Sequence, residues 1–202
     1  MTITIPTIVE GQGEVRALPI LLRRLGELYF PDCYLKIPPP HRLPRGKIIN
    51  RPDEFSRAIQ LAAAKGQDPT RAFIIVLLDS DDDCPADIGP ELAQTAKASR
   101  SDFLITISLA VREFESWVLA SASTLNGIHD LPQQLPVPDN PESIRNAKGW
   151  IKDKRSQKTY SETIDQPKFT SHIDIEVARK SSASFDRFCK KFQIMVDSLI
   201  LK

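Results

Sequence analysis

The chain has 202 residues, of which 41% are hydrophobic and 26% charged, a composition typical of a globular protein with a substantial core. No apolar run approaches the ~18 residues that a membrane span requires, so we expect no contact with membranes. Its three cysteines and three histidines are scattered along the chain, which argues against zinc and redox motifs. Unpaired, scattered cysteines are typical of a cytoplasmic protein, and that is the location we expect.

The net charge of +1 conceals an uneven distribution. Residues 1–144 carry 14 Lys and Arg against 19 Asp and Glu, a net of −5, whereas residues 145–202 carry 13 against 7, a net of +6. A basic C-terminal part beside an acidic body could hold a polyanion over a metal site. The alternative is an ordinary solvated helical surface.

Hydrophobic patterning predicts alternating strands and helices through residue 122. Continuous apolar or β-branched runs predict strands, and apolar residues at helical spacing predict helices. The run AFIIVLL at 72–78 has the composition of a central parallel strand. The expected order is strand 3–9, helix 14–30, strand 34–37, helix 53–66, strand 72–78, helix 90–99, strand 103–111 and helix 113–122.

This order predicts an α/β fold, a Rossmann-like parallel sheet with helices on both faces. The pattern changes after Gly127, where 131–141 is rich in proline and short helices follow. We therefore expect an α/β domain over 1–127 and a helical C-terminal extension over 128–202 that packs on it. The last helix should cover about 184–201.

Acidic residues follow two of the predicted strands. Glu10 ends the first strand with Glu14 just beyond it, and Asp79 and Asp81 follow strand 72–78. Ligands of open parallel sheets bind at the carboxyl ends of the strands. Like charges ~4 Å apart repel by about 4 kcal/mol at an effective dielectric of 20. The cluster therefore requires a bound cation, raised pKa values, or a cationic residue from elsewhere in the chain.

A bound divalent metal is the simplest of these three solutions. Ligands that are all oxygen favour Mg²⁺ or Mn²⁺ over zinc or copper. Glu113 and Glu115, which follow strand 103–111, are candidate further ligands. Helical periodicity lets only one of the two face the site, and the sequence does not decide which.

Two segments resemble the Toprim signature, a glutamate after the first strand and an Asp-x-Asp after the third. They are IVEG at 8–11 and LLDSD at 77–81, and the pair Glu10 and Glu14 is similar to the variant in OLD-type (overcoming lysogenization defect) nucleases. Three further segments resemble the family called domain of unknown function 4276. These are REFESW at 112–117, YSETIDQ at 160–166 and SASF at 182–185.

The resemblance implies a Toprim-like fold and metal-dependent cleavage of phosphodiester bonds in DNA or RNA. It implies Glu10, Asp79 and Asp81 as metal ligands and Glu14 as a further ligand or general base. Members of such families are associated with ATPases of the ABC/AAA type in phage defence. This chain has no Gly-rich phosphate loop ending in Lys-Ser/Thr, so a partner subunit would supply any ATPase.

Basic residues outside the acidic cluster are candidate nucleic-acid contacts. Arg42, Arg45 and Lys47 lie in a proline-containing segment without acidic residues, expected to be a loop. Lys158 precedes the 160–166 segment, where the family often carries a lysine. Whether any basic residue faces the metals is left open.

The sequence also allows other interpretations of the acidic residues and of the function. Asp79–Asp83 could be an acidic loop that caps the next helix, and Glu14 could serve only its helix N-terminus. The chain could also be a non-catalytic subunit that retains the fold and binds a partner protein. A metal-dependent phosphatase is a further alternative, because Asp79-Ser80-Asp81 resembles the nucleophile motif of haloacid-dehalogenase-like enzymes, although those place it after the first strand.

Overall fold

The computed structural model describes residues 1–201. It contains a parallel four-stranded sheet in the order β4-β2-β5-β6 and a parallel pair β1-β3. The strands are β1 (Thr2–Thr4), β2 (Thr7–Val9), β3 (Tyr34–Lys36), β4 (His41–Arg42), β5 (Phe73–Asp79) and β6 (Leu104–Ala110). The predicted parallel α/β fold is confirmed.

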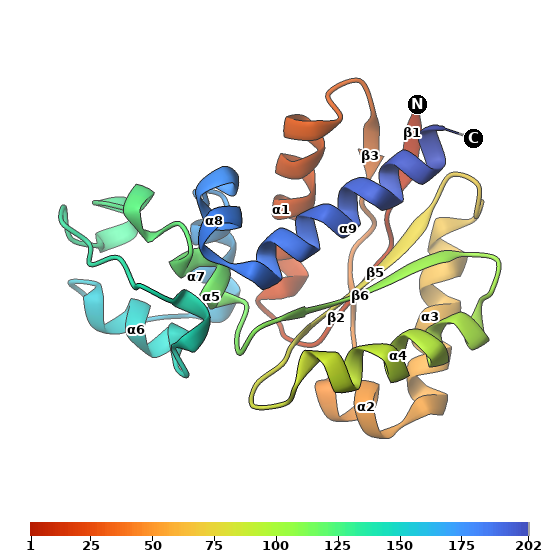
Figure 1. Ribbon diagram of the computed structural model, residues 1–202, viewed down its shortest axis with the longest axis horizontal. Coiled ribbons are helices and arrows are strands. Elements are labelled where there is room, and N and C mark those ends of the chain that lie inside the picture. Colours follow the sequence, from red (N-terminus) through yellow and green to blue (C-terminus); the bar gives the residue numbers. More distant parts are fainter. Residues whose placement is uncertain (202) are drawn as a thin grey trace.

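Helices cover both faces of the sheet (Figure 1). The α-helices of the first part are α1 (Glu14–Tyr29), α2 (Arg45–Asn50), α3 (Pro52–Gly66), α4 (Pro85–Ser99) and α5 (Glu115–Leu119). Those of the C-terminal part are α6 (Ala147–Lys154), α7 (Glu162–Thr170), α8 (Ile175–Ser181) and α9 (Ala183–Ile200). Short 3₁₀ turns occupy Ala122–Thr124, Ile128–Asp130 and Pro141–Ser143. Within residues 1–201, every helix is too short or too polar to cross a bilayer.

Strand β5 is buried along its whole length because it faces a hydrophobic core on each side. Phe73, Ile75 and Leu77 pack into the core that α1 and α9 cover. Ile74 and Val76 pack into the core beneath α3 and α4. A strand buried on both faces needs a continuous apolar sequence, which explains the run at 72–78.

The C-terminal helices belong to the same core as the first part. Phe185, Phe188 and Phe192 of α9 are buried together with Trp117 and with residues of α1 and β5. Figure 1 shows α9 crossing the sheet on the α1 side, while α6, α7 and α8 gather beside α5. A helical C-terminal part therefore packs on the sheet; the boundary at residue 127 stays a prediction.

Several predicted elements differ in detail. The expected strand 3–9 is two strands, because Pro6 lacks an N–H and the chain shifts from pairing with β3 to pairing with β4 and β5. The proline-containing segment with Arg42, Arg45 and Lys47, expected to be a loop, contains β4 and α2. Helix α4 begins at Pro85 rather than 90, since proline is favoured in a first helical turn. Helix α5 is limited to Glu115–Leu119.

Candidate metal centre

The carboxyl ends of the parallel strands converge at one rim of the sheet. Val9 pairs with Leu77, and Asp79 pairs with Ala110, so β2, β5 and β6 end side by side. Glu10 follows β2 directly, and Asp79 is the last residue of β5. The predicted convergence of Glu10 and Asp79 on one rim is thus present.

Four acidic side chains form what we call the carboxylate cluster: Glu10, Glu14, Asp79 and Glu115. Glu115 is fully buried, Glu14 and Asp79 are 4% and 5% exposed, and Glu10 is half-buried. Glu14 opens α1, and Glu115 opens α5 just beyond β6. Each of the four carboxylates therefore lies at a strand end or within a few residues beyond one.

The cluster strongly disfavours full ionisation. Burial, followed by the charges of Glu14, Glu10 and Glu115, raises the pKa of Asp79 well above its usual range. Burial and the charges of Glu14 and Asp81 raise the pKa of Glu10 to about 7. Like charges gathered in a partly dry site explain both shifts.

Glu115 is shifted in the same direction. Burial raises its pKa to about 7, although the Lys148 charge and a hydrogen bond from Tyr160 oppose the shift. At neutral pH, the protons that Glu10 and Glu115 retain lower the repulsion within the cluster.

Three C-terminal residues complete the surroundings of the cluster. The Tyr160 hydroxyl donates to Glu115 Oε1 at 2.7 Å. Gln166 Nε2 donates to Glu14 Oε1 at 2.8 Å and to Glu115 Oε1 at 3.3 Å. Lys148 Nζ pairs with Glu162 Oε1 at 2.9 Å. Burial lowers the pKa of Lys148, but the charges of Glu115, Glu162 and Asp79 raise it by more, so it lies above its ordinary value. Lys148 of α6 is thus a cationic residue that approaches the acidic cluster from a distant part of the chain.

These three residues were not assigned a role from the sequence. Gln166 lies 152 positions from Glu14, and Tyr160 45 positions from Glu115, so no local pattern connects them. The segment 160–166 stood out only through its family resemblance. Lys148 carried no signal beyond the basic character of its region.

Two glycines permit the close approach of these side chains. A Cβ on Gly11 would clash with Glu14 Oε2, and a Cβ on Gly13 would clash with Gln166 Oε1. Any larger residue would push Glu14 or Gln166 out of place. The packing of the cluster therefore requires glycine at positions 11 and 13 of the segment that joins Glu10 to Glu14.

Four oxygen atoms in this region are buried and have no hydrogen-bond donor. They are one oxygen each of Glu10, Glu14, Glu115 and Gln166, and they make up four of the seven such side-chain atoms in the described chain. Buried acceptors without a partner are costly and call for an ion or a bridging water. Carboxylate and amide oxygens are ligands that Mg²⁺ and Mn²⁺ accept, so the donor set fits such an ion.

The side chains are not arranged as a finished coordination sphere. Within residues 1–201, no three Asp, Glu, His or Cys residues stand in an arrangement that would hold a metal ion. Gln166 and Tyr160 take up one oxygen of Glu115, and a Phe114 N–H donates to Asp79 Oδ1 at 2.8 Å. Coordination would require the carboxylates to reorient around an ion.

Asp81 lies outside the cluster, at its mouth. Its side chain is 60% exposed and contacts Arg45 Nε at 3.3 Å. Arg45 also binds the carbonyls of Asp79 and Ser80 at 3.2 Å each, and the carboxylate of Asp83. Arg45 thus holds the acidic loop in this structure, and its nucleic-acid contact, suggested by the sequence, stays a prediction.

Asp82, in the same acidic loop, also has arginine partners. Asp82 is bound by Arg112 at 2.8 Å and by Arg145 at 3.1 Å. None of the loop aspartates caps α4, whose N-cap is Cys84 and has no side-chain capping bond. The interpretation of 79–83 as a helix-capping loop is therefore wrong.

The choice between Glu113 and Glu115 is resolved by their contacts. Glu115 adds to the charge at Asp79, whereas Glu113 accepts the backbone N–H of Lys148 at 3.1 Å. Glu113 thus anchors the start of α6, and Glu115 is the member of the cluster.

The remaining basic candidates are divided between the rim and other sites. Arg42 is exposed and donates to the Glu10 carbonyl at 3.1 Å. Lys47 pairs with Glu54 at 2.7 Å, and Lys158 binds the Asp153 carbonyl. Arg42 and Arg45 are therefore at the rim, and Lys148 rather than Lys158 is the lysine whose charge reaches the cluster.

A family model supports the sequence resemblance. The model described as domain of unknown function (DUF4276) matches residues 9–193. The chain belongs to this family. No curated protein and no solved structure matches it. The matched region includes the whole carboxylate cluster together with Lys148, Tyr160 and Gln166.

Proposed function

We propose that this DUF4276 member cleaves phosphodiester bonds of nucleic acid with the help of Mg²⁺ or Mn²⁺. The observation that supports it most is the group of four unpartnered buried oxygens at the rim where β2, β5 and β6 end. Their acidic neighbours repel one another strongly enough to raise the pKa values of Glu10, Asp79 and Glu115. A dication would relieve both problems at once.

The roles of the residues follow from their positions. Glu10, Glu14, Asp79 and Glu115 would hold the ion, and Asp81 would join them on leaving Arg45. A bound Mg²⁺ or Mn²⁺ activates water and stabilises charge on the reacting oxygens. Glu10, with a pKa of about 7, can accept a proton near neutral pH.

The C-terminal residues would position the carboxylates and the substrate. Gln166 and Tyr160 fix the orientation of Glu14 and Glu115 through hydrogen bonds. The Arg145 side chain is 72% exposed beside the acidic loop, and Arg42 is exposed at the rim. Exposed cations around an acidic centre can contact the phosphates on either side of the reacting one.

The Toprim and OLD-nuclease resemblance agrees with this assignment. Its glutamate and Asp-x-Asp segments coincide with Glu10 and with Asp79-Ser80-Asp81 at neighbouring strand ends. As part of the same proposal, an ATPase partner would provide any energy-dependent step, and a role in phage defence would follow from that partnership.

Cleavage of plasmid and of labelled DNA and RNA oligonucleotides in Mg²⁺ or Mn²⁺ tests the proposal. We expect the wild type to cut and Asp79→Asn to lose at least about 100-fold in rate, because changes to outer-shell partners of a metal alone cost about 10- to 100-fold. Asparagine retains an acceptor for the Phe114 N–H, so the variant should fold. Asp87→Asn, at an exposed position on α4, is the matched control. Equal rates for the wild type and Asp79→Asn would contradict the proposal.

A further inference from the structure

Strand β6 leaves one of its edges unpaired. It is the last strand of the sheet and, within residues 1–201, pairs only with β5. Its free edge faces a groove of about 670 Å³ between α4 and α9. Figure 1 shows β6 running between these two helices.

Hydrogen-bonding groups of the backbone point into this groove. The Ile107 carbonyl accepts a hydrogen bond from Lys191 of α9 at 2.6 Å, so Ile107 directs its backbone toward the free edge. Backbone direction alternates along a strand, which places the N–H and C=O groups of Ile105 and Leu109 on the same edge. Unpaired groups of this kind can pair with another extended chain.

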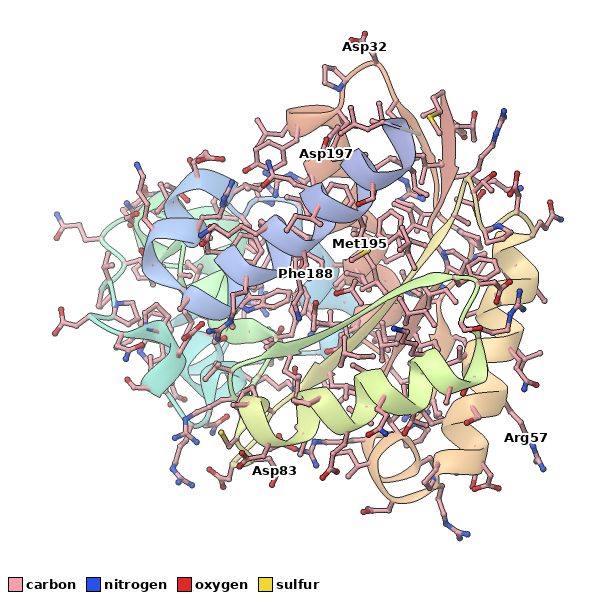
Figure 2. All side chains as sticks on the ribbon, turned by 45° about the vertical axis from the view of Figure 1, so that its right-hand side comes forward. Asp32, Arg57, Asp83, Phe188, Met195 and Asp197 are labelled. Carbon is pink, nitrogen blue, oxygen red and sulfur yellow. The ribbon has the colours of Figure 1, made fainter. Side chains whose placement is uncertain are left out.

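The walls of the groove contain an unsatisfied hydroxyl. Ser108 is 4% exposed, and its Oγ is buried without a hydrogen-bond partner. Apolar residues supply much of the remaining lining, among them Ile105, Leu109 and Phe188. Figure 2 labels Phe188 on α9. A bound strand would therefore find mainly apolar contacts in this groove.

The charged residues that line the groove are both basic. Arg187 and Lys191 lie one turn apart on α9, and within residues 1–201 neither has a carboxylate within ion-pair distance. In contrast, Lys190 on the same helix pairs with Asp186 at 2.7 Å. Pairing of two copies through this edge would bring four cations together, which disfavours a second copy as the occupant.

We propose that the free edge of β6 is a docking site for an extended acidic segment of a partner protein, which adds to the sheet as a fifth strand. Backbone pairing with Ile105, Ile107 and Leu109 would provide the register. Acidic side chains would pair with Arg187 and Lys191. Lys191, which now protects the Ile107 carbonyl, would move its ammonium to the incoming carboxylate. This docking site is independent of the metal centre.

A peptide titration monitored by NMR tests the proposal. The probe is the extended acidic heptapeptide TVEVDVT, added at up to millimolar concentration to the ¹⁵N-labelled full chain, with TVKVKVT as the matched basic peptide. We expect saturable shifts of the Ile105, Ile107 and Leu109 amides and slower exchange of their hydrogens. The basic peptide should bind roughly tenfold more weakly or worse.

A charge-reversal variant and a matched control complete the design. Arg187→Glu/Lys191→Glu should weaken binding of the acidic peptide by roughly tenfold or more. Arg57→Glu, at an exposed site that projects from α3 away from the groove (Figure 2), should leave it unchanged. Because Arg187 and Lys191 are exposed, the double variant should keep the wild-type circular dichroism spectrum.

Three results would overturn the proposal. The first is the absence of β6 shifts with the acidic peptide, and the second is equal binding of the two peptides. The third is a wild-type dimer in sedimentation that the double variant dissociates, which would make a second copy the occupant.

Discussion

The buried carboxylate cluster and the exposed acidic loop lie side by side but treat negative charge in opposite ways. Asp81, Asp82 and Asp83 are exposed, and each has an arginine partner. Asp79, at the start of the same acidic run, is buried among three other carboxylates, and its pKa is raised. Paired surface charges have little need of a further cation, whereas Glu10, Glu14 and Glu115 of the carboxylate cluster each retain a buried oxygen without any donor.

The contrast shows that burial and available partners, rather than the number of acidic residues, distinguish a candidate metal centre from a solvated loop. Arg45 lies between the two regions, because its guanidinium binds the loop carboxylates and the backbone carbonyls of Asp79 and Ser80. Four experiments can test whether the two regions differ in this way.

The largest expected difference is in metal affinity. Glu14→Gln removes a charge from the carboxylate cluster and should weaken Mn²⁺ binding by at least about 100-fold. Asp82→Asn removes a charge from the exposed loop and should change the affinity by less than about threefold. Isothermal titration calorimetry with Mn²⁺ measures both variants. Comparable losses in both would mean that the two regions do not differ as described.

The affinity for Mn²⁺ should also depend on pH. The pKa values of Glu10 and Glu115 are about 7, so these groups hold protons below that pH and must lose them to bind a metal. We expect affinity to rise by roughly 70-fold from pH 6 to pH 7.5, about eightfold for each of the two carboxyl groups, and to level off above pH 8. Calorimetry in buffers of different ionisation enthalpy should detect proton release on binding. Constant affinity without proton release would be inconsistent with the cluster.

Steric fit within the cluster predicts a difference between two glycines. Gly13→Ala should lower the free energy of unfolding by about 1 to 3 kcal/mol, because its Cβ would displace Gln166 from Glu14. Gly13 has φ −66°, so the cost comes from contact rather than backbone strain. Gly46→Ala in α2 meets no atom within 4 Å and should be neutral or slightly stabilising. Urea denaturation of the two variants would reveal the difference, and equal stability would argue against this packing.

Repulsion in the cluster predicts a smaller, pH-dependent gain in stability. The folded pKa of Glu10, about 7, lies above its ordinary 4.5, so its protonated form favours folding below pH 4.5. That contribution is lost as pH rises through 7. Without divalent ions, Glu10→Gln should be more stable than the wild type by about 1 kcal/mol at pH 8 and similar at pH 4.5. Thermal unfolding in EDTA at both pH values measures this, and a less stable variant at pH 8 would refute it.

The sheet and part of the candidate site could be predicted from the sequence because both depend on local patterns. The buried run at 72–78 defines a central strand, and parallel strands bring their carboxyl ends together, so Glu10 and Asp79 were expected at one rim. The break at Pro6 and the short helix α2 were missed. Pro6 interrupts an otherwise continuous β-branched run, and α2 lies in a segment whose prolines indicated a loop.

The partners of the carboxylates could not be predicted, because they come from distant parts of the chain. Lys148, Tyr160 and Gln166 reach the rim only after α6 and α7 have packed beside α1 and α5. Asp79 and Asp81 are two positions apart and have the same side chain, yet one is buried and the other binds Arg45. Tertiary packing makes that distinction.

In the proposed function, the carboxylate cluster binds a divalent cation. Crystals of the protein soaked in Mn²⁺ near pH 8 and measured at the manganese absorption edge would test it directly. We expect an anomalous peak bounded by Glu10 and Asp79, at about 2.0 to 2.3 Å from carboxylate oxygens. Well-ordered carboxylates without an anomalous peak, still bonded to Gln166 and Tyr160 alone, would contradict the claim.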